Sequence, residues 1–327
     1  MIRFGIVGCG GIAKKFARDI KFVKDAKLVA VSARTKEKAE KYKEQYMVPY
    51  AYSSYNDLAS SNEINAVYIA TPHSFHYEQA ILFLKHKKHV LVEKPIAVNQ
   101  LQFKEMIKVA KENNVLLMEA MWTYFLPSTI YIKKYIEDNN PGNLREANIS
   151  FGYALIDNYP EERRLLNPNL AGGSLLDMGV YPVSFYNLIS NTKIKNIDAK
   201  AELTSSGVDK TTYIKITDAS NSITNIKSSI EEHFDNNATL IYDNVKIKIQ
   251  DFSRSNKFYI NNKEYNIPYE GEGFVHQIRS FVNTIEENKI ENPIANHTLS
   301  MKTLEIMDQV RNKIGLTYPF EKNNTNL

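Results

Sequence analysis

The sequence almost lacks cysteine, since its 327 residues include a single thiol, Cys9. One cysteine excludes an intrachain disulfide and any metal cluster built from several thiolates, so Cys9 is expected only to fill its turn. Long apolar runs are absent too, because no stretch approaches the roughly 20 residues that span a bilayer. No positively charged segment with an apolar core precedes the first predicted strand. We therefore expect no signal peptide and predict a cytoplasmic protein.

Blocks of one charge are also missing. Lysine and arginine (41) barely outnumber aspartate and glutamate (37), and the resulting net charge of +4 is spread along the chain. Without a basic block or an arginine-rich arm, neither nucleic acid nor a membrane surface is an expected partner. A mildly basic surface suits a small phosphorylated or anionic ligand instead.

What the chain does contain is a glycine pattern, Gly8-x-Gly10-x-x-Ala13, directly after a short apolar run. The first glycine permits a tight turn, the second lets the backbone approach a pyrophosphate, and the small third residue lets helix pack on strand. A helix from about Gly11 would offer its free N–H groups to phosphates. A second apolar run at residues 27–33 completes a βαβ unit, which an ordinary glycine-rich loop would not require.

Strand and helix patterns then alternate. Strands are predicted at 66–70, 89–92 and 115–119, and helices at 36–46, 56–60, 75–86 and 100–113. The alternation predicts an α/β domain over residues 1–121 with a doubly wound, mostly parallel Rossmann sheet. Such sheets bind ligands beyond the carboxyl ends of their strands, where Gly8, Ser32, Thr71 and Lys94 would converge.

The pattern changes after Trp122, where strands with period-two alternation follow one another. They are predicted at 145–153, 198–203, 211–217, 225–230, 239–242 and 245–252, with helices at 175–189, 274–288 and 299–314. These runs predict an α+β substrate domain over residues 122–327 with a large, mostly antiparallel open sheet. One face of that sheet needs cover, which favours a homo-oligomer. The tail, residues 322–326, is expected to fray.

Five motifs carry a family resemblance through their order and spacing. They are Gly8-Cys9-Gly10-Gly11-Ile12-Ala13, Ala70-Thr71-Pro72-His73 with His76, Glu93-Lys94-Pro95, Glu119-Ala120-Met121-Trp122, and Gly172-Gly173-Ser174-Leu175-Leu176-Asp177-Met178-Gly179-Val180-Tyr181. Together they resemble the Gfo/Idh/MocA oxidoreductases over nearly the whole chain. Tyr181 makes the chain most similar to the branch that contains dimeric dihydrodiol dehydrogenases and NADP-dependent D-xylose dehydrogenases. The resemblance implies a homodimer or a homotetramer.

Tyr181 is our candidate for the proton transfer that accompanies hydride transfer. A tyrosine with its ordinary pKa of about 10 is a poor base at neutral pH unless a cation favours the phenolate, and Lys94 is the natural cation. The resemblance implies this role for the Glu93-Lys94-Pro95 motif, and Lys94 could also contact the nicotinamide ribose. The alternative is a core or surface tyrosine, in a chain that holds 20 of them.

Three further residues are predicted near the substrate. Asp177 lies four positions before Tyr181, so on a helix both side chains project from one face, where Asp177 would hold a substrate hydroxyl or orient the reacting group. Its alternative is a charge stabilised by the helix N-terminus. Arg164 is a candidate substrate contact, although Arg163 is equally available. Trp122 would either wall the nicotinamide pocket or pack in the core.

The end of the second predicted strand reads Ser32-Ala33-Arg34-Thr35, without the Asp or Glu that binds the ribose hydroxyls of NAD. Arg34 offers a planar cation for a 2′-phosphate or for the adenine face, Ser32 and Thr35 offer hydroxyls, and Lys38 lies one turn further on. NADP is therefore predicted over NAD, with a solvated surface arginine as the alternative. The predicted cofactor residues are Gly8, Gly10, Gly11, Ile12, Ser32, Arg34, Thr35, Lys38, Thr71, Pro72, His73, His76, Glu93, Lys94 and Trp122.

The predicted site lacks two features, a metal and an arginine. A metal is not predicted, because His73 and His76 have no third ligand spaced to join them. Sequences of the resembling branch often carry arginine where this chain has Tyr124, so whatever contact that arginine makes is absent here.

We therefore predict an NAD(P)-dependent oxidoreductase that moves a hydride between nicotinamide and a secondary alcohol or carbonyl of a sugar, polyol or cyclic diol. Its predicted catalytic residues are Lys94, Tyr181 and Asp177, and Trp122 and Arg164 join them in binding substrate. A catalytically silent NADP-binding sensor or regulator is the alternative, since a fold alone does not dictate chemistry.

Overall fold

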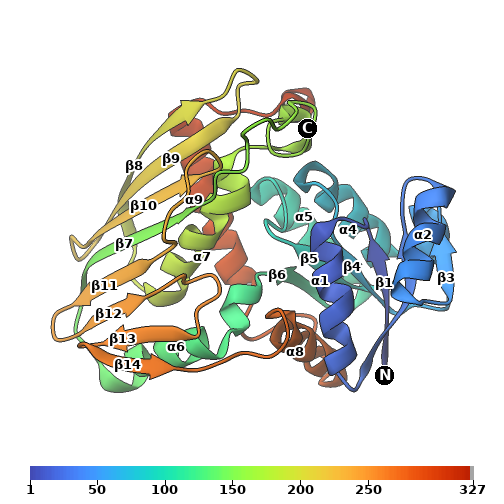
Figure 1. The fold of residues 1–327 in the computed structure, drawn as a ribbon, viewed down its shortest axis with the longest axis horizontal. Coiled ribbons are helices and arrows are strands. Elements are labelled where there is room, and N and C mark those ends of the chain that lie inside the picture. Colours follow the sequence, from blue (N-terminus) through green and yellow to red (C-terminus); the bar gives the residue numbers. More distant parts are fainter. Residues whose placement is uncertain (325–327) are drawn as a thin grey trace. The chain divides into compact units, whose positions relative to one another are not determined.

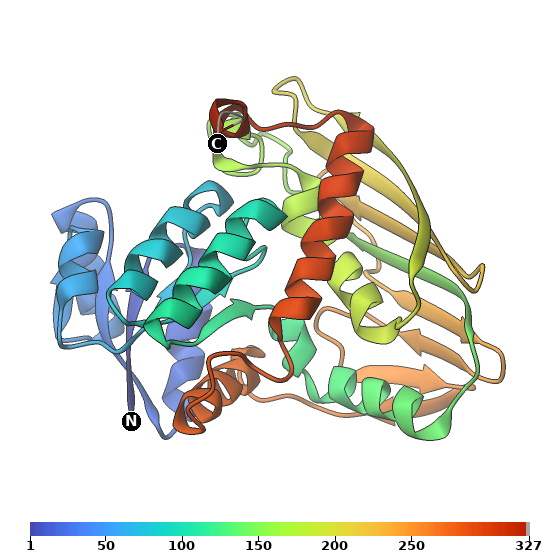
Figure 2. The ribbon, with the colours of Figure 1, turned by 180° about the vertical axis from the view of Figure 1, so that it is seen from behind.

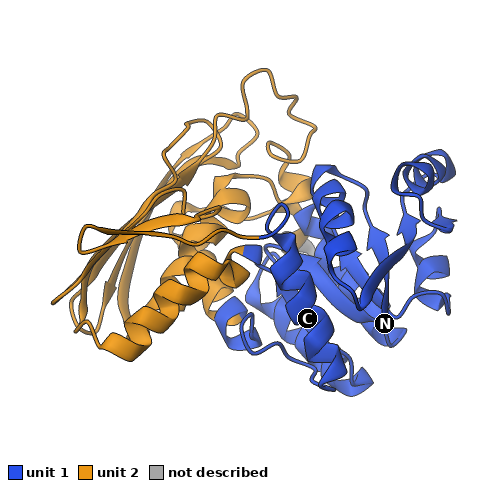
Figure 3. Cartoon of the chain, turned by 60° about the horizontal axis from the view of Figure 1, so that its bottom comes forward, with its two compact units in different colours: residues 1–122, 270–300 blue, residues 123–269, 301–327 orange. Residues whose placement is uncertain are grey.

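The computed structural model describes residues 1–324 and divides them into two compact units (Figure 3). The first unit comprises Met1–Trp122 and Glu270–Ser300, and the second comprises Thr123–Tyr269 and the chain from Met301 onward. Among the described residues, every helix is too short or too polar to serve as a membrane span.

The first unit is built on a six-stranded parallel sheet. Its strands are β1 (Ile2–Val7), β2 (Ala26–Ser32), β3 (Tyr50–Tyr52), β4 (Ala66–Ile69), β5 (His89–Glu93) and β6 (Leu117–Ala120). They lie in the order β3-β2-β1-β4-β5-β6, so the direction of winding reverses between β1 and β4. The predicted Rossmann sheet is thereby confirmed, and its switch point is where such sheets bind dinucleotides.

Helices cover both faces of this sheet. They are α1 (Gly11–Asp19), α2 (Lys36–Tyr46), α3 (Tyr55–Ser60), α4 (His76–Lys85), α5 (Gln100–Asn113) and α8 (Phe274–Glu286), with short 3₁₀ turns at Ile20–Phe22 and His73–Phe75. Figure 1 shows α1 on the near face, and Figure 2 shows α4 and α5 on the opposite face. Strand β3 was not predicted, because its three residues are too few to show a period.

Residues 270–300 belong to the first unit, although the sequence analysis assigns them to the second domain. Their helix α8 packs against α1. The buried carboxylate of Asp19, at the end of α1, accepts hydrogen bonds from the backbone N–H groups of Glu272 (2.9 Å) and Phe274 (2.8 Å). This attachment spans more than 250 residues of sequence, so a local pattern cannot reveal it.

The second unit contains an eight-stranded sheet. Its strands are β7 (Leu144–Gly152), β8 (Ile194–Leu203), β9 (Asp209–Asp218), β10 (Ile223–Ser229), β11 (Ala238–Tyr242), β12 (Lys246–Ile249), β13 (Lys257–Ile260) and β14 (Lys263–Asn266). Their order is β14-β13-β12-β11-β7-β10-β9-β8, with β7 and β10 parallel and the other neighbours antiparallel. The predicted large, mostly antiparallel sheet is confirmed.

One face of this sheet carries the helical elements. They are α6 (Pro127–Asn139), α7 (Val180–Ile189), most of α9 (His297–Ile314), a π-helical turn (Leu175–Gly179) and 3₁₀ turns at Trp122–Phe125, Pro168–Leu170 and Pro319–Asn324. The π-helical turn and α7 contact β7 and β10, where Ile149 and Phe151 of β7 and Ile226 of β10 are buried. No helix of the described residues covers the opposite face (Figures 1 and 2). The tail expected to fray is helical up to Asn324, and residues 325–327 lie outside the described residues.

Candidate active site

The turn after β1 requires glycine at its first position. Gly8 has a φ of +86°, and a Cβ added there would lie 2.6 Å from Cγ2 of Thr71 and 3.0 Å from the carbonyl oxygen of Ala70. A left-handed conformation and a close approach of β4 both exclude a larger side chain. The backbone N–H of Gly8 also donates to the carbonyl of Ser32 (3.1 Å). The turn therefore joins the carboxyl ends of β1, β2 and β4 within one unit.

The next two glycines, Gly10 and Gly11, border open space. A Cβ added to Gly10 or Gly11 would meet no atom within 4 Å. Gly10 caps α1 without a side-chain hydrogen bond, and the first turn of α1 contains no acidic residue. Free N–H groups, a positive helix end and an open approach fit the pyrophosphate of a dinucleotide. Ile12, in the same turn, is half-buried.

Cys9, between Gly8 and Gly10, points back into the fold. Its Sγ lies 3.6 Å from the carbonyl oxygen of Ser32, and burial raises the pKa of the thiol to about 12. A neutral, buried thiol is a poor nucleophile, so the residue fills its turn as expected.

The end of β2 presents an unpaired hydroxyl and exposed cations. Ser32 is completely buried, and its Oγ has no hydrogen-bond partner within the described residues, which leaves it able to bind a ligand atom. Arg34 and Lys38 are exposed. Thr35 has a structural role that the sequence analysis did not assign, because its Oγ1 caps α2 by accepting from the N–H of Lys38 (3.3 Å).

The loop after β4 holds two buried histidines. His73 lies in the 3₁₀ turn that follows Pro72, and its ring packs edge-on to that of His76 at 5.7 Å. The two ring nitrogens of His76 lie 2.8 Å from the carbonyl oxygen of Pro95 and 2.9 Å from that of Thr71. Complete burial lowers the pKa of His76 to about 3. A neutral imidazole carries a single N–H, so the ring donates to one of these two carbonyl oxygens and packs against the other, between the loop after β4 and the loop after β5.

Lys94 follows β5 and is flanked by buried carboxylates. Glu93 accepts from the hydroxyl of Tyr68 and from the N–H of Lys94 (3.3 Å). Glu119, at the end of β6, accepts from the N–H of Ile96 (3.0 Å). Glu119 is part of a motif that carried the family resemblance, yet the sequence analysis gave it no role, because its contact with the Lys94 loop depends on the pairing of β5 with β6.

Trp122 packs within the first unit. Its ring stacks on that of Phe274, with centroids 5.6 Å apart and planes 13° from parallel, and only 6% of the residue is exposed. A side chain at Gly273 would collide with the indole, and Gly273 has a φ of +98°. The structure thus supports the packing alternative for Trp122, and its place beside the nicotinamide remains a proposal.

In the second unit, Asp177 and Arg164 form a bidentate ion pair. Nη1 of Arg164 lies 2.6 Å from Oδ1 of Asp177, and Nη2 lies 3.3 Å from Oδ2. Asp177 is 4% exposed and lies in the π-helical turn before α7. Arg163 instead lies over the ring of Tyr159, 5.6 Å from its centroid. The structure therefore separates two arginines that the sequence left equivalent, and π-helical turns occur often at functional sites.

Tyr181 follows in the first turn of α7. Its ring centroid lies 4.8 Å from that of Phe151 on β7, and the residue is 8% exposed. Tyr124 donates from its hydroxyl to the carbonyl of Ser184 (3.2 Å), one turn after Tyr181. Tyr124 is therefore a buried side chain that binds the backbone of α7.

The start of the π-helical turn is fixed by two residues that no local signal in the sequence reveals. Asp209 is completely buried and accepts from the N–H of Leu175 and from Oγ1 of Thr212, both at 2.6 Å. Burial raises the pKa of Asp209 to about 7. Tyr318 donates to the carbonyl of Gly172 (2.7 Å). These contacts hold the loop that leads into Asp177.

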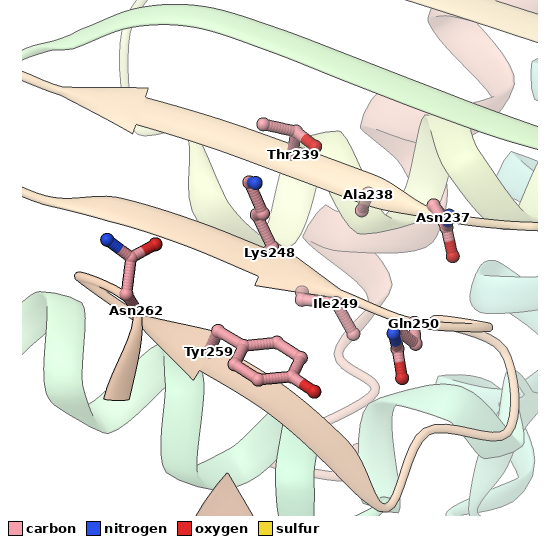
Figure 4. Close-up of a pocket in the computed structure, with 8 residues that line it drawn as sticks. All are labelled: Asn237, Ala238, Thr239, Lys248, Ile249, Gln250, Tyr259 and Asn262. Carbon is pink, nitrogen blue, oxygen red and sulfur yellow. The ribbon is translucent and has the colours of Figure 1, made fainter. Parts of the chain in front are cut away.

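The second unit also contains a cavity of about 380 Å³ (Figure 4). It lies over neighbouring strands, where the side chains of Thr239, Lys248 and Tyr259 come from β11, β12 and β13 (Figure 4). None of its lining residues is a predicted site residue. Elsewhere in the described chain, no three His, Cys, Asp or Glu side chains gather as metal ligands would.

The strand order, the Gly8 turn and the uncapped start of α1 define a Rossmann protein whose first unit fits a dinucleotide. The chain belongs to the Gfo/Idh/MocA family of oxidoreductases. The sequence model described as "Oxidoreductase family, NAD-binding Rossmann fold" matches residues 2–121, and the "GFO/IDH/MocA C-terminal domain" matches residues 129–247. The family resemblance found in the sequence is thereby confirmed.

Two relatives are similar over their full length. The chain is 32% identical to scyllo-inositol 2-dehydrogenase (NADP(+)) IolU of Bacillus subtilis, over 98% of this chain and 100% of the relative. It is 31% identical to trans-1,2-dihydrobenzene-1,2-diol dehydrogenase of Mus musculus, over 98% and 99%.

Solved structures share the fold at lower identity. A 3-ketoreductase from Actinomadura kijaniata, in complex with NADP and TDP-benzene, superposes with a TM-score of 0.86 at 21% identity, over 96% of this chain and 98% of that one. The aldose-aldose oxidoreductase of Caulobacter crescentus, complexed with glycerol, superposes with a TM-score of 0.85 at 21% identity, over 95% and 97%. Both solved structures share the two-part architecture of this chain.

Proposed function

We propose that this oxidoreductase is an NADP-dependent dehydrogenase that oxidises a secondary alcohol of a cyclic polyol, sugar or cyclic diol. The observation that carries the proposal is the π-helical turn of the second unit, which precedes Tyr181 with a buried, arginine-paired carboxylate, Asp177. Such a pair provides fixed acceptors and donors for a hydroxyl-rich substrate. The names of the two full-length relatives, an inositol dehydrogenase and a dihydrodiol dehydrogenase, support the same substrate class.

The preference for NADP rests on the end of β2. The turn from Ser32 to Thr35 has no carboxylate, and Arg34 and Lys38 are exposed there. An exposed guanidinium can bind a 2′-phosphate through two hydrogen bonds, while the ribose of NAD finds no acidic partner. One full-length relative is named as an NADP(+) enzyme, which supports this choice.

We assign the remaining roles as follows. The first unit would hold the cofactor through Gly8, Gly10, Gly11, Ile12, Ser32, Arg34, Thr35, Lys38, Thr71, Pro72, His73, His76, Glu93, Lys94 and Trp122. NADP, when bound, supplies the nicotinamide that takes or returns a hydride. The Lys94 ammonium favours the phenolate of Tyr181, which accepts the proton of the substrate hydroxyl. Asp177 and Arg164 hold the neighbouring hydroxyls of the substrate.

Turnover with a panel of inositols, aldoses and dihydrodiols tests this function. We expect reduction of NADP faster than of NAD, and a loss of about 10²- to 10⁴-fold in kcat in Tyr181→Phe with NADP binding unchanged, as for removal of a general base. Tyr186→Phe, on the same helix, is the matched control and should keep kcat. NADP binding without turnover on any member of the panel would favour the silent sensor instead, and full turnover by Lys94→Met would exclude its assigned role.

We also propose that the uncovered face of the second sheet forms the subunit contact of a homodimer or homotetramer. It exposes Ile223 of β10 among polar side chains, and an open sheet face of this size needs cover. Light scattering at several protein concentrations tests the assembly, and a monomer at all of them would exclude it.

The proposed location is the cytoplasm, because a reducing compartment suits a chain with one thiol and no disulfide.

A further inference from the structure

The backbone after Lys94 is held by side chains from two other elements of the first unit. His76 of α4 lies with Nδ1 2.8 Å from the carbonyl oxygen of Pro95. Glu119 of β6 accepts with Oε1 from the N–H of Ile96 at 3.0 Å. The two residues that follow Lys94 are therefore fixed on both sides, one through a carbonyl and the other through an N–H.

Glu119 has a second, equally buried partner. Its Oε2 accepts from the hydroxyl of Ser300 at 2.6 Å, and the two residues are 3% and 2% exposed. The first turn of α9 is itself tied to β6, because Nε2 of His297 lies 2.9 Å from the carbonyl oxygen of Leu117. Both carboxylate oxygens thus accept a hydrogen bond from a donor that is fixed in the fold.

The charge of Glu119 also acts on Lys94. Burial raises the pKa of Glu119, while the donors Ser300 and Ile96 and the positive charge of Lys94 favour the carboxylate. By the same interaction the carboxylate favours the ammonium form of Lys94. The other titratable side chains linked to this loop in the first unit are Glu93 and His76, with His73 beyond.

We propose that Glu119, with Ser300, is the positioning pair for Lys94: it fixes the loop that carries the lysine and places a carboxylate within electrostatic reach of its ammonium group. The inference rests on the proposed role of Lys94 and adds the residues that hold Lys94 in position for that role. It also explains why a carboxylate is placed in a fully buried position, where its charge is costly without a nearby cation.

The test is the pH dependence of kcat in Glu119→Gln, which keeps the shape and an acceptor for the N–H of Ile96 but removes the charge. We expect the alkaline limb of the profile to move to lower pH by about one unit, because the ammonium of Lys94 loses a favourable charge. We expect kcat at neutral pH to fall about tenfold or more, as when a general acid–base group is misplaced. Ser300→Ala should move the limb in the same direction by less.

Glu291→Gln is the matched control. Glu291 accepts from the N–H of His297 at 2.6 Å and so anchors the same end of α9 without touching the Lys94 loop. We expect it to leave the profile unchanged.

The outcomes separate the inference from the proposed function. An unshifted profile in both Glu119→Gln and Ser300→Ala, with Lys94→Met inactive, overturns the positioning role alone. An active Lys94→Met overturns the proposed function and the role of Glu119 with it. If Glu119→Gln does not fold, the shift in Ser300→Ala decides.

Discussion

Arg164 clamps both carboxylate oxygens of Asp177, at 2.6 Å and 3.3 Å, although its neighbour Arg163 lies over the ring of Tyr159. The pair is uneven in exposure, because the Asp177 side chain is 6% exposed and that of Arg164 is 39% exposed. The guanidinium therefore binds Asp177 from a side chain that stays partly exposed. Such a half-exposed pair can both orient a carboxylate and receive a polar substrate.

Arg164→Ala should raise KM for the polyol substrate about tenfold or more, because a hydrogen bond to a charged group contributes about 1.5–3 kcal/mol. Steady-state kinetics with saturating NADP measure the effect. Arg163→Ala is the control and should keep KM within about twofold, in the range of an exposed contact. Equal effects of the two substitutions would contradict the assignment of Arg164.

Gly8→Ala and Gly10→Ala should separate folding from cofactor binding. Gly8 has a positive φ and no room for a Cβ, so alanine should lower the free energy of unfolding by about 1–3 kcal/mol. Gly10 has open space, so alanine should change that free energy by no more than about 0.5 kcal/mol. Urea unfolding measures both.

Gly10→Ala should nevertheless weaken NADP binding about tenfold or more, because the pyrophosphate is expected where the new methyl group would lie. Titration calorimetry measures the dissociation constant. Wild-type affinity in this variant would show that the cofactor does not approach the backbone at Gly10.

Arg34→Ala should raise KM for NADP about tenfold or more and leave KM for NAD unchanged, because only NADP carries the 2′-phosphate that the guanidinium would bind. The ratio of kcat/KM for the two cofactors is the readout. Lys41→Ala, an exposed cation on α2, the helix that follows Arg34, is the control. A parallel loss with both cofactors would place Arg34 against the adenine or outside the site.

Asp209 should make stability depend on pH. Burial raises its pKa from 3.8 to about 7, so between these values the folded chain keeps a proton that the unfolded chain releases. The contribution of Asp209 to stability is therefore greatest at low pH and declines as the pH rises from about 4 to about 7, by about 4 kcal/mol in all.

Asp209→Asn removes this decline, so the unfolding free energy of the variant minus that of the wild type should rise with pH over that window and stay level above it. Chemical denaturation at a series of pH values gives the difference. Asp198→Asn, at an exposed position of β8, is the control. A difference that is independent of pH would show that Asp209 has the same pKa in the folded and the unfolded chain.

The local features of the chain were readable because they depend on neighbours in sequence. The helices at 36–46 and 100–113 have the predicted bounds, and the glycine turn after β1 was identified from its spacing. The end of β2 was readable for the same reason, since the absence of a carboxylate is a property of four consecutive residues. Periodicity and turn chemistry act over a few residues, so they determined the fold class and the cofactor class.

Long-range packing decided the rest. Sequence could not choose between Arg163 and Arg164, find the π-helical turn, or show that Asp209 and Ser300 serve loops far along the chain, because each depends on a contact made only after the sheets form. Buried polar groups must find partners wherever the fold supplies them, and those partners need not be near in sequence. The sequence by itself thus determined which residues could do the chemistry, whereas the tertiary structure decided which side chains hold them in place.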